Sequence, residues 1–402
     1  MTDFSAGPRP AAGTEAGRLR LESHERRAVG ALAGIYAVRM LGLFLLFPVL
    51  ALYGRGLPGA TPLLTGLAVG AYGLTQAALQ IPFGTLSDRL GRKPVIAAGL
   101  VLYAAGSVLG STATGIWGMI VARMVQGAGA VSGPVTALLA DLTRAGIRTR
   151  AMALIGISIG ASFIVSLIAA PLLAAAIGVP GIFLVMAGLA VLSLVLLYGV
   201  VPPPPPPAGR AAGGGLAAAL RADLMPYYLG ILALSAVLSA TFVGVPYALH
   251  DALGLAMSDH WQTYLGVFLA SIPPTVALVF WTERSSVPDR VMRIAIALLA
   301  ISLGAIGFVY GRYWPLCGAL AAFFTAFNYL EARLPARLSQ AAQPAVRGAA
   351  LSVFATAQFL GSFGGATAAG WLSGGRMGLM GVFGAASLLT LGWLLLYRAR
   401  PA

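Results

Sequence analysis

The chain has 402 residues, of which 58% are hydrophobic and 9% are charged, and its mean hydropathy is +0.87. A soluble domain usually carries about 25% charged residues, so this composition excludes a large soluble protein and indicates a chain embedded in a lipid bilayer. The net charge of +14 does not indicate a nucleic-acid partner, because the basic residues recur in short clusters between apolar runs.

Taken in chain order, the apolar runs predict twelve membrane-spanning helices, and the expected fold class is an all-α membrane protein with two six-helix bundles. The runs lie near residues 29–53, 63–86, 94–113, 115–141, 151–177 and 180–201, and then near 225–249, 261–282, 291–311, 314–336, 348–373 and 378–397. The expected domains are a cytoplasmic tail at 1–28, bundles at 29–201 and 225–397, a cytoplasmic linker at 202–224 and a short cytoplasmic tail at 398–402. The linker opens with six prolines, which cannot continue a helix.

The Lys and Arg residues are distributed unevenly between the two sides of the predicted helices. With the N-terminus in the cytoplasm, 20 of the 26 fall on the cytoplasmic side, and only Arg55, Arg312 and Arg376 fall outside. Cytoplasmic loops of membrane proteins carry such an excess, so both termini are predicted to be cytoplasmic. On the outer side, His250 and Asp251 are interpreted as a solvated helix end, with sensing of external pH as the alternative.

The loop between the second and third spans carries the most specific motif. From Gly84 to Pro94 it reads Gly-Thr-Leu-Ser-Asp-Arg-Leu-Gly-Arg-Lys-Pro. An acid at one helix end and bases at the start of the next can hold helices together, and an acid near a helix N-terminus gains about 0.3–1 kcal/mol from the helix dipole. A plain basic loop would explain the three bases but neither the acid nor the two glycines.

This loop resembles the GxLSDRxGRK signature of the major facilitator superfamily. The fourth span adds Arg123-Met-Val-Gln126-Gly127-Ala-Gly129-Ala, which is similar to the RxxQGxGxA pattern of the family. Together with Phe327–Pro335 in the tenth span, these motifs resemble the YajR-type branch, a set of bacterial proton-driven, drug-efflux-like transporters. The fifth span departs from the antiporter pattern, since alanines replace most of its glycines.

In that family the motif acid and bases form a charge relay with an acid at the end of helix four. The resemblance therefore implies a conformational latch made of Gly84, Asp88, Arg89, Gly91, Arg92, Lys93 and Asp141. It also implies that this relay stabilises the outward-facing state and loosens when its acid is protonated. The loop between spans eight and nine keeps charged residues but lacks the glycine pattern, so we expect the first half to dominate the latch.

Charged side chains within the predicted spans are further candidates, because each costs at least about 2.5–3.5 kcal/mol on insertion scales. The resemblance implies that helices one, four, seven and ten line a central cavity, and three of these four carry a charge. The candidates for the substrate and proton cavity are Arg39, Arg123, Gln126, Asn328, Glu331 and Gln358. For the two arginines, a structural role that fixes backbone carbonyls or an irregular helix competes evenly with a role in binding or coupling.

Glu331 is the one acid predicted to lie well inside the bilayer. Burial favours the neutral form of a carboxyl group, so Glu331 is expected to exchange a proton during transport. The alternative is a permanent ion pair with Arg333 or Arg39.

The sequence offers no signature of enzyme chemistry. It has one cysteine, no cluster of metal-ligand residues and no GxxxxGK[ST] phosphate loop, so we expect no catalytic residue, no metal and no cofactor. The leading hypothesis is a monomeric transporter of the bacterial cytoplasmic (inner) membrane that couples export of a small amphipathic compound to proton entry. The alternatives are proton-coupled uptake of a small metabolite and a membrane sensor or channel that does not cycle.

Overall fold

The computed structural model describes residues 23–203, 215–285, 288–343 and 346–397. Most of the predicted N-terminal tail, the C-terminal tail and the prolines from 204 onward therefore lie outside the described residues. The first half of the chain forms α2 (Ser23–Leu45), α3 (Leu50–Arg55), α4 (Pro62–Leu90), α5 (Arg92–Ser111), α6 (Ile116–Ala128), α7 (Ser132–Asp141) and α8 (Ala145–Gly199). The second half forms α9 (Gly215–Ala219), α10 (Met225–Tyr247), the π-helix η1 (Ala248–Ala252), the 3-10 turn η2 (Met257–Asp259), α11 (His260–Arg284), α12 (Pro288–Val309), α13 (Tyr313–Ala341), α14 (Arg347–Ser373) and α15 (Gly378–Leu396).

The predicted all-α class with twelve crossing helices is confirmed. Eight of the described helices are long and apolar enough to span a membrane by length and composition, and one of them, α8, is long enough for two crossings. The remaining three crossings are α4, α13 and the pair α6–α7, which carry more polar residues or are broken. Large apolar side chains such as Phe308, Trp314 and Leu395 are strongly exposed on the outside, as expected of a surface that faces lipid.

Local sequence explains where the helices end. Thr61 caps α4 by accepting a hydrogen bond from the backbone N–H of Leu64, and Pro62 occupies the first turn, where its missing N–H costs nothing. Gly91 separates α4 from α5 with φ +94°, a conformation that only glycine adopts readily. Gly178, with φ +70°, interrupts α8 where the sequence predicts the boundary between spans five and six.

Two predicted spans are broken in ways that hydropathy did not indicate. Span one divides into α2 and α3, and span four divides into α6 and α7 at residues 129–131. The second break lies where a methyl group on Gly127 or Gly129 would collide with the backbone carbonyls of Tyr72 and Gly99. Glycine therefore allows the broken helix to approach its neighbours closely. Within the predicted linker, the described residues Gly215–Ala219 form the short helix α9.

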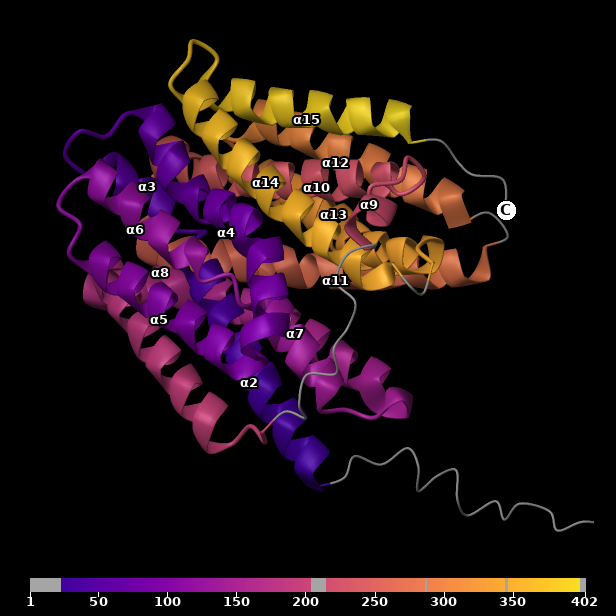
Figure 1. Cartoon of the computed structure of the whole chain (residues 1–402). Helices are drawn as coiled ribbons and strands as arrows, with labels where there is room; N and C mark the ends of the chain where they lie inside the picture. Colours follow the sequence, from indigo (N-terminus) through magenta and orange to yellow (C-terminus); the bar gives the residue numbers. More distant parts are fainter. Residues whose placement is uncertain (1–22, 204–214, 286–287, 344–345, 398–402) are drawn as a thin grey trace, which may run out of the picture.

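The halves meet along α4 and α14, which run antiparallel. A methyl group added at Gly66 would lie 2.5 Å from the carbonyl oxygen of Ala366, and one added at Gly73 would lie 2.7 Å from that of Phe359. We call the end of the helices that holds Arg55 the Arg55 end, and the end that holds Gly91 the motif end. Figure 1 shows the helices of the two halves meeting near α3 and spreading apart toward the motif end.

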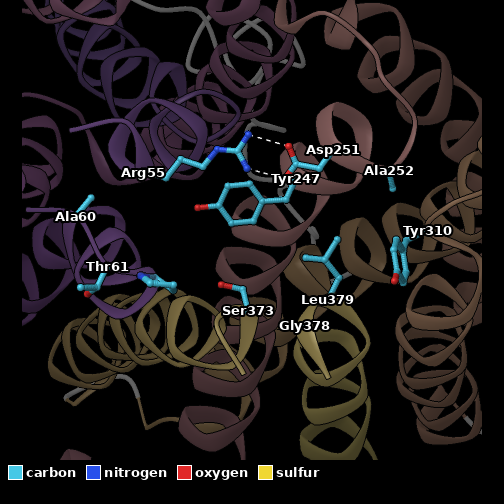
Figure 2. Close-up of a pocket in the computed structure, with 11 residues that line it drawn as sticks. Arg55, Ala60, Thr61, Tyr247, Asp251, Ala252, Tyr310, Ser373, Gly378 and Leu379 are labelled. Carbon is cyan, nitrogen blue, oxygen red and sulfur yellow. Dashed lines mark hydrogen bonds and ion pairs between the residues drawn. The ribbon is translucent and has the colours of Figure 1, made fainter. Parts of the chain in front are cut away.

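Polar contacts also join the halves at the Arg55 end, beside a cavity of about 440 Å³ (Figure 2). Arg55 donates two hydrogen bonds to the carboxylate of Asp251, at 2.5 and 2.7 Å. The hydroxyl of Tyr247 donates to the backbone carbonyl of Ala51 at 3.1 Å. Asp251 is thus not simply a solvated helix end, as the sequence suggested, because it pairs with a residue from the other half.

Candidate functional site

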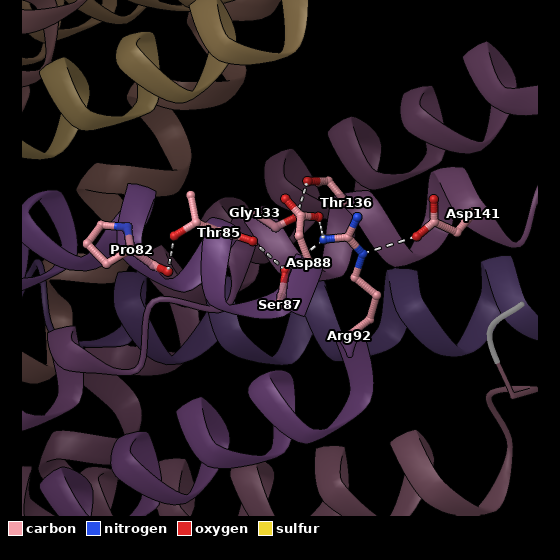
Figure 3. Close-up of polar contacts among 9 residues, drawn as sticks. Pro82, Thr85, Ser87, Asp88, Arg92, Gly133, Thr136 and Asp141 are labelled. Atoms are coloured by element: carbon pink, nitrogen blue, oxygen red, sulfur yellow. Dashed lines mark hydrogen bonds and ion pairs between the residues drawn. The ribbon is translucent and has the colours of Figure 1, made fainter. Parts of the chain in front are cut away.

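The motif loop brings three predicted latch residues together (Figure 3). Arg92, the first residue of α5, lies between Asp88 near the end of α4 and Asp141 at the end of α7. Its guanidinium is 2.5 Å from Asp88 Oδ1 and 3.1 Å from Asp141 Oδ2. It also donates to Ser87 Oγ at 2.7 Å, a partner that sequence reasoning missed. One arginine therefore links three helices of the first half.

The other predicted latch residues lie around this cluster without joining it. Gly91 supplies the turn, whereas Gly84 lies inside α4 with open space around it. Arg89 is exposed. Lys93 donates to the backbone carbonyl of Val201 and lies 6.0 Å from the ring of Tyr198, so it fastens α5 to the end of α8.

The second half contains an ion pair in the corresponding place. Asp289 at the start of α12 pairs with Arg337 near the end of α13, and the hydroxyl of Tyr397 donates to the same carboxylate. Acid and base have exchanged places relative to Arg92 and Asp141. The loop before α12 lacks the glycine pattern of the motif, so the sequence predicted a latch dominated by the first half. For the same reason the sequence did not predict the pair of Asp289 and Arg337.

Replacing Arg92 with Ala is expected to destabilise the protein, whereas replacing Arg89 with Ala is not. Arg92 is mostly buried and makes charged hydrogen bonds to two helices, so its loss should lower the free energy of unfolding by about 1–3 kcal/mol. Arg89 is exposed and should change it by less than about 0.5 kcal/mol. Thermal unfolding of both variants in detergent checks this, and equal losses would contradict a latch centred on Arg92.

Arg39 is buried inside the first half, with only 2% of its surface exposed. It donates to Tyr72 Oη at 2.8 Å, to Gln76 Oε1 at 2.5 Å and to Ser132 Oγ at 2.9 Å. Ser132 is the first residue of α7, directly after the break in span four. These contacts favour the structural interpretation of Arg39, in which it fixes an irregular helix.

Arg123 lies on the other side of the same break and is 1% exposed. It donates to Gln126 Oε1 at 2.8 Å, Gln126 donates to Ser107 Oγ at 2.8 Å, and the guanidinium lies 4.9 Å from the centre of the Tyr72 ring. Arg123 forms no ion pair with the residues that the structure describes, and contact with the aromatic face stabilises its charge. The two arginines are thus joined through Tyr72 into one network of the first half.

Glu331 lies in α13 with a different set of neighbours. Gln358 of α14 donates to Glu331 Oε1 at 2.8 Å, and the buried Oε2 atom has no hydrogen-bond partner. Among the described residues Glu331 forms no ion pair, so neither Arg39 nor Arg333 neutralises it. Asn328, one turn earlier, lies 3.4 Å from Ser271 Oγ of α11. Within the part of the chain that is described, no hydrogen bond connects these residues with the arginine network, and none connects Asn328 with the pair formed by Glu331 and Gln358.

Six phenylalanines from both halves pack together where the two halves meet. We call this set the aromatic cluster: Phe44, Phe47, Phe163, Phe242, Phe268 and Phe324. Between the halves, the ring centres of Phe47 and Phe242 are 5.4 Å apart, and those of Phe163 and Phe242 are 5.9 Å apart. Glu331 follows Phe324 by seven residues, which is about 10 Å along α13 toward the motif end. Nothing in the sequence distinguished these rings from other apolar residues.

Comparison with known proteins agrees with this architecture. A sequence profile of the Major Facilitator Superfamily matches residues 32–330. The chain is 38% identical over 375 residues to the inner membrane transport protein YajR of Escherichia coli K12, which covers 92% of this chain and 82% of that protein. It is 36% identical over 107 residues to the multidrug resistance protein MdtH of Yersinia enterocolitica, covering 26% and 27% of the two chains.

A solved structure extends the agreement to the fold. The partially occluded, inward-open conformation of the xylose transporter XylE from E. coli superposes with a TM-score of 0.70 at 15% identity, covering 93% of this chain and 97% of that one. The family profile matches most of the chain, and the similarity to YajR extends over 92% of it. Both findings lead to one assignment. This chain belongs to the Major Facilitator Superfamily.

Proposed function

We propose that this secondary transporter exports a small amphipathic compound in exchange for protons. Glu331 supports the coupling most directly, since it is an acid inside the second half that forms no ion pair with any described residue. Such a carboxyl group can be neutral or charged without breaking an ion pair. The names of YajR and MdtH, a transport protein and a multidrug resistance protein, support export from the cytoplasm.

We further propose that residues 29–201 and 225–397 are two bundles that rock about the cavity between them, joined by the linker at 202–224. The excess of Lys and Arg at the motif end supports a cytoplasmic motif end with both termini inside. With that orientation, contacts at the Arg55 end close the protein toward the outside. In the proposed cycle the protein works as a monomer, without a cofactor and without enzyme activity.

Transport into inside-out membrane vesicles tests the proposal. Vesicles with an acidic lumen should accumulate a fluorescent lipophilic dye only when the protein is present, and dissipating the pH gradient should abolish the accumulation. The compounds to test come from a toxicity screen in a strain that lacks its own efflux systems.

Two other results would replace the proposal. Movement of the compound out of the lumen together with protons would indicate uptake by symport. A passive leak that is independent of the gradient would indicate a channel.

A further inference from the structure

The contact between Arg55 and Asp251 joins residues that are 196 positions apart in the chain and lie in different halves. Arg55 ends α3, and Asp251 lies in the π-helix that follows α10. Both oxygens of the carboxylate accept from the guanidinium, at 2.5 and 2.7 Å, in the two-pronged geometry that orients an arginine and a carboxylate strongly. The guanidinium also lies 5.1 Å from the centre of the Tyr247 ring. Figure 2 shows Arg55 and Asp251 facing each other beside Tyr247.

Tyr247 extends this contact into the protein. Its ring supports Arg55, while its hydroxyl donates to the carbonyl of Ala51, so a side chain of the second half holds the backbone of α3. Ala51 is fully buried. The aromatic cluster lies deeper, with Phe47 and Phe242 in contact between the halves. From the surface inward, the halves are therefore joined by an ion pair, a tyrosine bridge and packed rings.

We propose that Arg55, Tyr247 and Asp251 form a reversible lock that keeps the Arg55 end closed and that must open once in every transport cycle. This inference rests on the proposed alternating access of the two halves. Of the ion pair, the tyrosine bridge and the packed rings, only the ion pair lies at the surface. Its Arg55 and Asp251 side chains are 39% and 47% exposed. Exposed ion pairs are weak, so water can replace the contact when the halves part. A strong buried pair in this position would hold the protein in one state.

The labelling rate of a buried cysteine measures how often this end opens. The native Cys317 is replaced with Ser, Ala51 is replaced with Cys, and the protein in lipid nanodiscs is treated with a membrane-impermeant maleimide. Ala51 is fully buried beneath Tyr247, and the aromatic cluster separates it from the motif end, so the reagent must enter between the halves at the Arg55 end. The rate then follows the fraction of molecules that are open.

The variants Arg55→Glu and Asp251→Lys should each label up to about fivefold faster, because each removes the ion pair. The double variant Arg55→Asp, Asp251→Arg should return to the slow rate, since it restores the pair with its charges exchanged. Arg376→Glu is the matched control, because Arg376 is an exposed arginine at the same end, and its loss should leave the rate unchanged.

Equal labelling rates in the parent and both single variants would overturn the lock. Fast labelling in the charge-exchanged variant would also overturn it, because any change at these positions would then have the same effect. The measurement needs no substrate, so it is independent of the vesicle assay. A protein that opens as described but moves no compound would refute the proposed export while leaving the lock in place.

Discussion

Glu331→Gln is expected to abolish transport that is driven by a pH gradient, down to the level of vesicles without the protein. Glutamine has nearly the same size and can still accept the hydrogen bond from Gln358, so the local packing is kept. Glutamine cannot bind and release a proton, so the pH gradient can no longer drive movement of the substrate. Exchange of labelled for unlabelled substrate in the absence of a gradient should continue, because that exchange needs no net proton movement.

Two further variants separate proton coupling from general damage. Glu331→Asp keeps an acid and should keep part of the gradient-driven transport. Asp259→Asn removes an exposed acid at the Arg55 end and should transport like the parent protein. If Glu331→Gln retained full pH-driven transport, Glu331 would not carry the proton.

The sequence predicted depth along each helix well, but not direction around it. The spans predicted to begin near residues 63 and 94 correspond to helices that begin at Pro62 and Arg92. Glu331 and Arg39 were assigned to one cavity because each is a costly charge inside a span and because the resemblance implies that both of their helices line that cavity. In the structure, Arg39 donates to side chains of α4 and α7, whereas Glu331 accepts from Gln358 of α14, so each is held within its own half. The packing of whole helices determines which neighbours a side chain faces, and an apolar run in the sequence does not indicate this.

Contacts between distant residues divide in the same way. Asp88, Arg92 and Asp141 could be grouped because a recognisable motif names all three, and the structure brings them together. Arg55 and Asp251 could not be paired, because their contact exists only after the halves dock and neither residue lies in a recognised motif. The close approach of α4 and α14 could not be predicted for a related reason. Glycines in a helix indicate that another backbone packs closely there, but they do not indicate which helix it belongs to.

The largest effect on conformation is expected from a substitution at the close contact between α4 and α14. Gly66→Ala places a methyl group 2.5 Å from the carbonyl oxygen of Ala366 and 2.8 Å from the Cα of Gly370, so α4 and α14 must separate at the Arg55 end. Overpacking of this kind costs about 1–3 kcal/mol. Here the cost applies only to the closed arrangement, so the ratio of open to closed molecules should rise about tenfold for each 1.4 kcal/mol. Transport should fall, and maleimide labelling of the cysteine at position 51 should accelerate.

Two other glycines show why the position matters. Gly364→Ala, in α14, adds its methyl group to open space and should leave both labelling and transport unchanged. In Gly365→Ala the new methyl group collides with the backbone of Ala236, in a helix of the same half, and that contact is needed in every conformation. This variant should lose about 1–3 kcal/mol of unfolding free energy without a selective gain in labelling. If Gly66→Ala behaved like Gly365→Ala, the contact between α4 and α14 would be a permanent part of the fold, and the two halves would not separate there.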